Sequence, residues 1–241
     1  MSRQTDIPPR GAPVENWTPP IVPPADLCLD GRYAQVQSLS ADKHAALLYR
    51  TYEGADQVWD YLPYGPFSSA ALYHRWARDV SGQLDPFFVA IHNKETRAFE
   101  GVASFLRIDP KAGSIEVGHI NFSPALQKTR AATEALFLMM AWAFEQGYRR
   151  FEWKCDALNV PSRRAAQRLG LSYEGVFRQA TVVKGRNRDT AWFATIDKEW
   201  PALSEAFRMW LDPANFDDTG AQKERLADFT RLVRVADDPT L

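Results

Sequence analysis

The chain has 241 residues, 45% of them hydrophobic, and a formal net charge of −1 at pH 7. This length and composition suit one large domain with a real core, and the near-neutral charge offers no electrostatic footprint for nucleic acid or an anionic membrane surface. The two cysteines, Cys28 and Cys155, are far apart, which excludes a disulfide framework and a cysteine-based metal site. No apolar run approaches the roughly 18 residues that a membrane span needs, so we expect a soluble protein of the reducing cytoplasm.

The first segment of the chain is rich in proline. Residues 1–25 hold seven of the 16 prolines, and each proline removes a backbone donor and restricts φ. We therefore predict an extended arm at 1–25 that lies on the domain through Trp17. The main domain then spans 26–200, and a C-terminal helical extension spans 201–241.

The first half of the main domain predicts helices followed by strands. Ser40 is the expected N-cap of a helix, and the aromatic loop YLPYGPF at 61–67 precedes another. From Pro86 onward the apolar pattern alternates as in strands joined by short turns, which indicates an antiparallel meander. The predicted elements are a strand at 33–39, helices at 40–51, 55–61 and 68–80, and strands at 87–92, 101–108 and 114–122.

The second half contains a helix with nine consecutive apolar residues at 136–144, which ends at Gly147. A strand, a helix and another strand imply a right-handed crossover, so we place 150–155 parallel to 114–122 and near it. The remaining predicted elements are a helix from Asn159 to Leu169, a hairpin of strands at 173–183 and 189–196, and helices at 197–211 and 222–235.

The element order and several motifs resemble the GNAT acyltransferases. INFSP at 120–124, followed by QKTRAA at 127–132, is similar to the end of that family's central strand and the helix start after it. ATEA at 132–135 and NVPSRRAAQRLGLSYEGVFR at 159–178 resemble the ribosomal-protein N-acetyltransferase branch, the RimJ/RimL type. The resemblance covers about 33–196. It implies an α/β (α+β) fold, with a mixed, mostly antiparallel sheet flanked by helices, and an N-acetyltransferase that uses acetyl-CoA.

The helix start at 127–132 is the predicted cofactor site. A helix start presents unpaired N–H groups and a positive dipole end, which suit a diphosphate; the other interpretation is an ordinary capped helix. Arg130 stands where the family has its first glycine, so it either turns its side chain away or contacts a phosphate directly. The residues that we expect to bind coenzyme A are Ile120, Asn121, Phe122, Gln127, Lys128, Thr129, Arg130, Ala131, Ala132, Asn159, Ser162 and Arg163.

Acetyl transfer requires a base that removes a proton from the amine and a donor that protonates the departing thiolate. Glu116 is one candidate base, directly or through water, and its other interpretation is a solvent-facing strand residue. His119 should lie on the opposite face of the strand from Glu116, because strand side chains alternate. It is the second candidate base, or else a structural histidine. The resemblance also implies that backbone groups of Ile120 and Phe122 pair with the pantetheine arm.

The position at which many GNAT enzymes have a proton-donating tyrosine, seven residues after Asn159, is Ala166 in this chain. We therefore expect Ser162 to contact the sulfur, the other interpretation being a residue of a helix N-terminus and nothing more. Asn159 should order the loop and the pantetheine, a role compatible with a helix cap. Arg163 and Arg164 are expected to reach phosphates, unless they are simply solvated.

The acceptor is expected to be a primary amine, either of a protein N-terminus or of a small molecule. Trp59 and Tyr64 surround the loop that covers the acceptor site in this family, and packing beneath that loop is the alternative role of such aromatic side chains. Trp153 and Asp156 end the next strand close to the same cleft. Asp156 carries a charge that attracts an ammonium group.

Two other hypotheses remain open from the sequence. A catalytically silent acyl-CoA-binding protein that works as a sensor would also fit the missing tyrosine and the substitution at Arg130. Alternatively, the arm and the 212–241 tail form a homodimerisation device, since apolar stripes outside a core need cover. We expect no nucleic-acid and no membrane partner.

Overall fold

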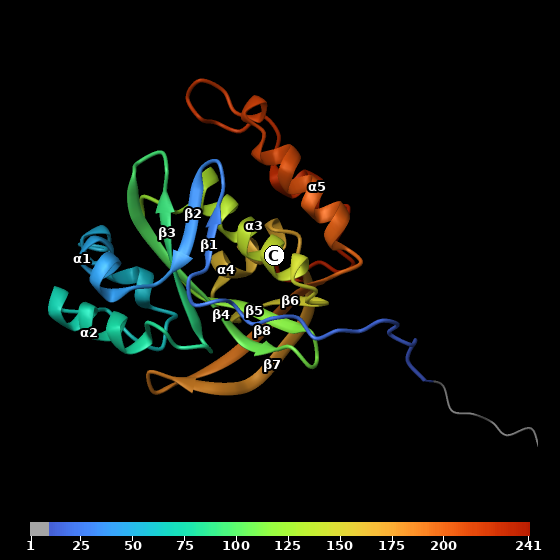
Figure 1. Cartoon of the computed structure of the whole chain (residues 1–241), viewed down its shortest axis with the longest axis horizontal. Helices are drawn as coiled ribbons and strands as arrows, with labels where there is room; N and C mark the ends of the chain where they lie inside the picture. The colour runs from blue at the N-terminus through green and yellow to red at the C-terminus, as the bar shows by residue number, and fades with distance from the viewer. Residues whose placement is uncertain (1–9) are drawn as a thin grey trace, which may run out of the picture.

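The computed structural model describes residues 10–241 and has one mixed sheet at its centre, with the strand order β1-β2-β3-β4-β5-β6-β8-β7 (Figure 1). The strands are β1 (Cys28–Asp30), β2 (Ala34–Ser38), β3 (Phe87–Asn93), β4 (Ala98–Asp109), β5 (Ser114–Phe122), β6 (Arg150–Asp156), β7 (Ser172–Val183) and β8 (Arg186–Ile196). The helices are α1 (Ala41–Thr51), α2 (Ala70–Val80), α3 (Arg130–Glu145), α4 (Val160–Arg168), α5 (Trp200–Leu211) and α6 (Leu226–Thr230), with short 3-10 turns at η1 (Asp56–Trp59) and η2 (Pro213–Asn215).

The pairing of the strands confirms the predicted topology. β3, β4 and β5 form the antiparallel meander, and α3 carries the chain across to β6, which pairs with β5 in parallel. β7 and β8 form the predicted hairpin, with a turn limited to Lys184 and Gly185. The edge strand β1 was not predicted, because three residues are too few to show a period.

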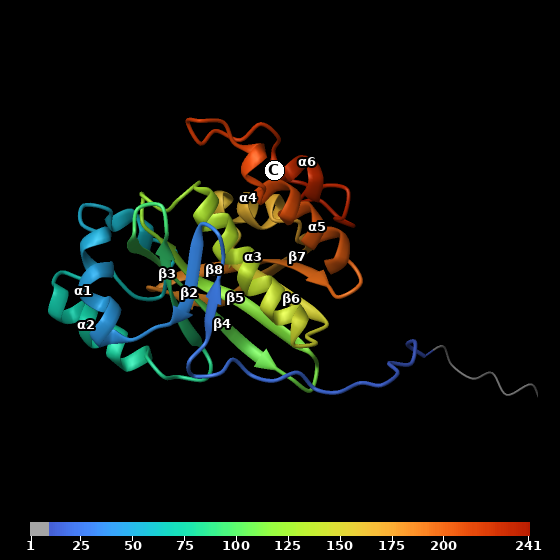
Figure 2. The same cartoon turned by 45° about the horizontal axis from the view of Figure 1, so that its top comes forward.

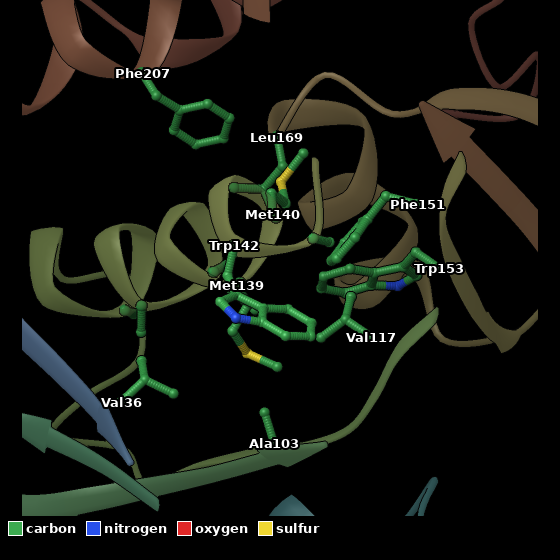
Figure 3. Packing of buried hydrophobic residues seen from close by; sticks show 14 of the residues in the cluster. Val36, Ala103, Val117, Met139, Met140, Trp142, Phe151, Trp153, Leu169 and Phe207 are labelled. Atoms are coloured by element: carbon green, nitrogen blue, oxygen red, sulfur yellow. The ribbon is translucent and has the colours of Figure 1, made fainter. Parts of the chain in front are cut away.

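Helices cover both faces of the sheet (Figure 2). α1 and α2 pack on one face, where Leu48 and Tyr73 are fully buried. α3 and α4 pack on the other, and α5 lies outside α3. Met139 of α3 points toward Ala103 of the sheet, whereas Phe207 of α5 lies on the opposite side of the helix (Figure 3). The apolar run of α3 is therefore buried on both sides, which explains why it has no polar face.

The parallel pair β5 and β6 separates partway along its length. The two strands pair from Ser114 with Arg150 as far as Val117 with Trp153. Beyond that point β5 continues beside β4, and β6 continues beside β8. Residues 118–122 thus leave one backbone edge facing a gap in the sheet. Because α3 follows β5 and α4 follows β6, both helices begin beside this gap.

A β-bulge lies in β5 at the gap. The pairing with β4 shifts after Gly118, and His119 takes a φ of 49°. The centroid of the His119 ring lies 5.1 Å from that of the Phe88 ring. Phe88 pairs with Ser104, and Ser104 pairs with Gly118, so these residues share one face of the sheet. Glu116, two residues before Gly118 on β5, lies on the same face. The expectation that His119 and Glu116 lie on opposite faces is therefore wrong, because the extra residue of the bulge breaks the alternation.

The N-terminal arm runs along the domain from residue 10 onward, and residues 1–9 of the predicted arm lie outside the described part. The Trp17 ring packs against the glycine turn at Gly113, beneath the Arg149 guanidinium at 5.5 Å. The Tyr148 hydroxyl also donates to the carbonyl of Ile21 at 3.1 Å. Among the helices of residues 10–241, none is sufficiently long and apolar to cross a membrane.

The C-terminal tail differs from its prediction. Only α6 is helical within 222–235, and Leu232 is 81% exposed, whereas Leu226 is buried and Val233 packs against the core. The chain then continues as an extended segment whose Ala236 carbonyl accepts from the Tyr173 backbone N–H at 3.1 Å. Because most of the predicted apolar stripe is covered by the same chain, the stripe is no reason for a dimer.

Candidate active site

The start of α3 presents free donors to the cleft. Thr129 is the N-cap, and its hydroxyl accepts from the Ala132 N–H at 3.0 Å. Lys128 has a left-handed φ of 63°, which turns the loop into the helix. Across residues 10–241, no acceptor is found for the backbone N–H groups of Lys128, Arg130 and Ala131. Three donors at the positive end of a 16-residue helix make a site for an anion such as a diphosphate.

The side chain of Arg130 is turned away from these donors. Its guanidinium forms an ion pair with Glu95, with Nε 3.0 Å from Oε2. The same group lies 4.4 Å from the ring centroid of Tyr33 and 5.1 Å from that of Phe216. The side chain of the arginine that replaces the family's glycine is therefore held by Glu95 and Phe216, and it braces the β3–β4 turn and the C-terminal extension.

One cleft of about 1470 Å³ joins the helix start to the gap between β5 and β6. The predicted residues that line it are Ile120, Phe122, Gln127, Lys128, Thr129, Arg130, Ala132, Trp153, Asn159 and Ser162. Arg164, which was predicted together with Arg163 to reach phosphates, also lines it. Further lining residues that the sequence did not single out are Arg168, Trp210, Phe216 and the loop from Asp218 to Gln222. The extension is thus one wall of the cleft. No local pattern marks this wall, because the packing of α5 on α3 decides which loop faces the helix start.

The other end of the cleft is organised by α4. Asn159 caps α4, and its Oδ1 accepts from the Ser162 N–H at 3.1 Å. The indole Nε1–H of Trp153 donates to Ser162 Oγ at 3.0 Å. Since this bond uses the oxygen as an acceptor, the hydroxyl proton of Ser162 remains available to a group in the cleft. Trp153 therefore lines the same end of the cleft as Ser162 and orients its hydroxyl, and its contact with the acceptor stays a prediction.

Three predicted cofactor residues do not line the cleft: Ala131, which is fully buried, Arg163 and Asn121. Arg163 is buried and its guanidinium binds the carboxylate of Asp238, with Nε–Oδ2 at 2.7 Å and Nη2–Oδ1 at 2.6 Å. It is a structural residue, and its neighbour Arg164 faces the cleft instead. Asn121 is 2% exposed, and its backbone carbonyl accepts from the Tyr52 hydroxyl at 2.8 Å. The strand places Ile120 and Phe122, but not Asn121, along the cleft wall.

Glu116 lies at the base of the gap within a network of charges. Its Oε1 accepts from Arg107 Nη1 at 2.7 Å, and its Oε2 lies 2.9 Å from Lys154 Nζ. Lys154 also pairs with Glu152 at 2.7 Å. Burial raises the pKa of Glu116, and the charges of Arg107 and Lys154 oppose this rise. The alternative of a solvent-facing Glu116 is wrong, because its side chain is 3% exposed.

His119 stands on the same face and contacts the aromatic loop. Its Nδ1 is 3.0 Å from the Tyr64 hydroxyl, and the two rings are stacked with centroids 5.6 Å apart. Burial, together with the charges of Arg107 and Arg188, lowers the pKa of His119 to about 4. The imidazole is therefore neutral at pH 7, with one nitrogen available as an acceptor.

The two other residues expected at the acceptor site have local structural roles. The Trp59 side chain is 3% exposed and packs beneath Gly65, so the packing interpretation holds for it. Asp156 Oδ1 accepts from the Leu158 N–H at 2.8 Å and shapes the turn before α4. Of the four predicted acceptor residues, Tyr64 is the one that the structure brings to the face of Glu116 and His119.

The pH dependence of stability tests the buried state of His119. The pKa of His119 is about 4 in the folded protein and about 6.5 in an unfolded chain. Between these pH values the unfolded state binds one more proton than the folded state, so the free energy of unfolding falls as the pH drops from about 6.5 to about 4. We expect His119→Gln to reduce the loss of unfolding free energy between pH 7.5 and pH 5 by about 2 kcal/mol. Urea titrations at both pH values measure it, and equal losses in the two proteins would contradict the assignment.

Comparisons with known proteins agree with this geometry. A model of the acetyltransferase (GNAT) domain matches residues 37–172. Among solved structures, a GCN5-related N-acetyltransferase from Brucella melitensis is 44% identical with a TM-score of 0.88, over 90% of this chain and 100% of that chain. A GNAT-family acetyltransferase from Chromobacterium violaceum is 41% identical with a TM-score of 0.76, over 81% and 98%. No curated protein sequence matches.

The ribosomal-protein branch is represented by a more distant structure. RimL, a ribosomal alpha-N-protein acetyltransferase, is 19% identical with a TM-score of 0.61, over 71% of this chain and 94% of that chain, a likeness of fold alone.

The sheet with its parallel gap, the donors at α3 and the cleft define an acyltransferase. The chain belongs to the GNAT acetyltransferase family, whose members generally use acetyl-CoA. The matched segment ends at residue 172, so β8, α5 and the cleft wall at 210–222 lie beyond it.

Proposed function

We propose that this protein is an acetyl-CoA-dependent N-acetyltransferase that acetylates a primary amine by direct attack on the thioester. The observation that carries the proposal is the continuous cleft, which is lined by Lys128 and Arg130 with their free N–H groups at the start of α3 and by the unpaired edge of β5 at its other end. This arrangement fits an elongated molecule with a diphosphate and an amide-bearing arm. Acetyl-CoA has both, and it supplies the acetyl thioester.

The residues of the cleft divide the binding task by chemistry. The N–H groups of Lys128, Arg130 and Ala131 hold the diphosphate. Backbone groups of Ile120 and Phe122 pair with the pantetheine arm in the manner of an added strand, because β6 has moved away from them. Asn159 holds the turn that carries Ser162, and the Ser162 hydroxyl reaches toward the sulfur.

The proton transfers fall to residues on both sides of the gap. Glu116, or His119 as the alternative, accepts a proton from the amine on the face opposite the cofactor. Ser162 donates a hydrogen bond to the departing thiolate, since Ala166, at the position of the family's tyrosine, is fully buried and cannot reach it. The amine is that of a small molecule or of a protein N-terminus. The likeness in fold to RimL, a ribosomal alpha-N-protein acetyltransferase, motivates the second of these.

Binding of acetyl-CoA tests the cofactor site. Arg130→Glu places a carboxylate beside Glu95 and at the positive end of α3, so we expect the acetyl-CoA dissociation constant to rise by about tenfold or more. Isothermal titration calorimetry measures it. Arg208→Glu, the same charge change at an exposed residue of α5, is the control and should leave the constant unchanged. Equal constants for wild type and Arg130→Glu would count against this site.

Thiol release separates an enzyme from a silent sensor. Incubation with acetyl-CoA and a panel of amines should release free coenzyme A in proportion to acetylated amine. Tight binding with no release across amino acids, polyamines and peptide N-termini would favour the sensor and overturn the proposed activity.

A further inference from the structure

The hairpin β7–β8 carries two side chains that face the same side of the sheet as Glu116. Trp192 is the register partner of Lys154, whose Nζ lies 3.8 Å from the Trp192 ring centroid. Lys154 also lies 2.9 Å from Glu116. Arg188 is four residues before Trp192 on β8, and side chains of a strand alternate, so it shares this face. We call the face with Glu116, His119, Lys154, Arg188 and Trp192 the acceptor face.

The charges on the acceptor face are paired, with Arg188 as the exception. Arg107 and Lys154 both bind Glu116, and Lys154 also binds Glu152. Within residues 10–241 the Arg188 guanidinium forms no ion pair, and its Nε is buried without an acceptor. The indole Nε1 of Trp192 is likewise buried without an acceptor. Buried donors without partners are costly, so two of them on one face indicate that a ligand supplies the missing acceptors.

These donors lie close to the gap through which the amine must reach the thioester. The charge of Arg188 contributes, after burial and Arg107, to the low pKa of His119, which stands at the gap. Two contacts close the space around them. Lys184, at the hairpin tip, donates to the Trp59 carbonyl at 2.9 Å, and the Tyr61 hydroxyl donates to the Leu158 carbonyl at 3.3 Å. The tip of the hairpin therefore reaches across to the η1 turn, on the side of the sheet where α1 and α2 lie (Figures 1 and 2).

We propose that the acceptor is a small amine that bears a carboxylate, such as an amino acid, and that Arg188 binds this carboxylate as its specificity-determining residue. The Nε–H and Nη–H groups of an arginine match the two oxygens of a carboxylate, and the Trp192 N–H is a third donor. Holding the carboxylate on β8 directs the amine toward Glu116 and His119 at the gap. The inference rests on the proposed acetyl transfer and adds the class of its acceptor.

Pairs of acceptors that differ only in charge test the inference. We compare kcat/KM for alanine, leucine and glutamate with the corresponding values for alaninamide, leucinamide and isoglutamine. At least one acid should be preferred over its amide by about tenfold or more, and Arg188→Gln should bring that ratio to within about threefold of one. Arg178→Gln, an exposed arginine of the same hairpin, should keep the wild-type ratio.

Two further measurements keep the outcome interpretable. Arg188→Lys retains the charge but lacks the paired N–H groups of the guanidinium, so it should lose part of the preference for acids over amides. Circular dichroism verifies that each variant folds, and calorimetry verifies that it binds acetyl-CoA. A preference for amides, or an unchanged ratio in Arg188→Gln, would overturn the inference. If no amine is acetylated, the proposed activity fails, and the carboxylate site is then tested alone. Calorimetry measures the binding of the same acids and amides to the coenzyme A-loaded protein. Acids that bind no better than their amides would overturn the assignment of a carboxylate to Arg188.

Discussion

Replacing Glu116 with Gln should lower kcat for amine acetylation by about 10²- to 10⁴-fold and leave the acetyl-CoA dissociation constant within about twofold, because a positioned base acts on the transferred proton and not on the cofactor. Glu116 stands at the last pairs before β5 and β6 separate, and both of its oxygens are held, one by Arg107 and one by Lys154. Glutamine keeps the shape of the side chain and cannot accept the proton. Steady-state kinetics and calorimetry measure the two quantities.

Glu152 is the matched control for Glu116. The two glutamates are register partners on β5 and β6 and share Lys154, so a general disturbance of the network would affect both variants. We expect Glu152→Gln to keep kcat within about fivefold of wild type. Similar losses in both variants would assign Glu116 a structural role, and a large loss confined to His119→Gln would assign the base to the histidine.

The pH profile gives a second criterion for the same residue. A carboxylate base acts only when it is ionised, and burial raises the pKa of Glu116 above the ordinary value. Wild-type kcat/KM should therefore decline on the acidic side as Glu116 becomes protonated. The residual activity of Glu116→Gln should lack this decline, and a variant that keeps it would contradict the role of Glu116 as the base.

Replacing Asp238 with Asn should lower the free energy of unfolding by about 3–5 kcal/mol, because it leaves the Arg163 guanidinium buried without its counter-charge. The side chain of Asp238 is fully buried, and it accepts two hydrogen bonds from Arg163. This ion pair attaches the end of the tail to α4, which carries Ser162 and Arg164 into the cleft. Urea unfolding monitored by tryptophan fluorescence measures the loss.

The neighbouring residue is the control for Asp238. Asp237 pairs with Arg234 at 2.7 Å, but its side chain is 66% exposed. The Arg234 side chain is 7% exposed, but it keeps a second acceptor in the Gln167 carbonyl. An ion pair whose carboxylate faces water contributes little, so Asp237→Asn should change the free energy of unfolding by less than about 1 kcal/mol. Equal effects of the two substitutions would show that burial of the pair does not govern the stability of the tail.

The fold could be predicted from the sequence because its signals are local. The alternation of strand residues, the helix caps and the glycines that end helices all depend on residues within or next to each element. The right-handed crossover rule then placed β6 beside β5. The same local chemistry predicted the helix start at 127–132, where Thr129 caps α3 and neighbouring N–H groups stay free. The motif around Asn159 and Ser162 was found for the same reason.

Where the prediction was wrong, the deciding partner is distant along the chain. The bulge at His119 depends on the pairing of β5 with β4 and turns the imidazole to the face of Glu116. Arg163 and Arg164 are adjacent and chemically equal, and Asp238, 75 residues away, decides which one is buried.

The sequence by itself thus determined the order of most elements, the family resemblance and the capped start of α3 with its free N–H groups, since each depends on neighbouring residues. Only the tertiary structure decided which side chains meet: Arg130 turned to Glu95 and Phe216, the extension forming a wall of the cleft, and, within residues 10–241, Arg188 left without a counter-charge. The physical reason is that charge pairing and burial depend on distance in space, which local periodicity does not encode.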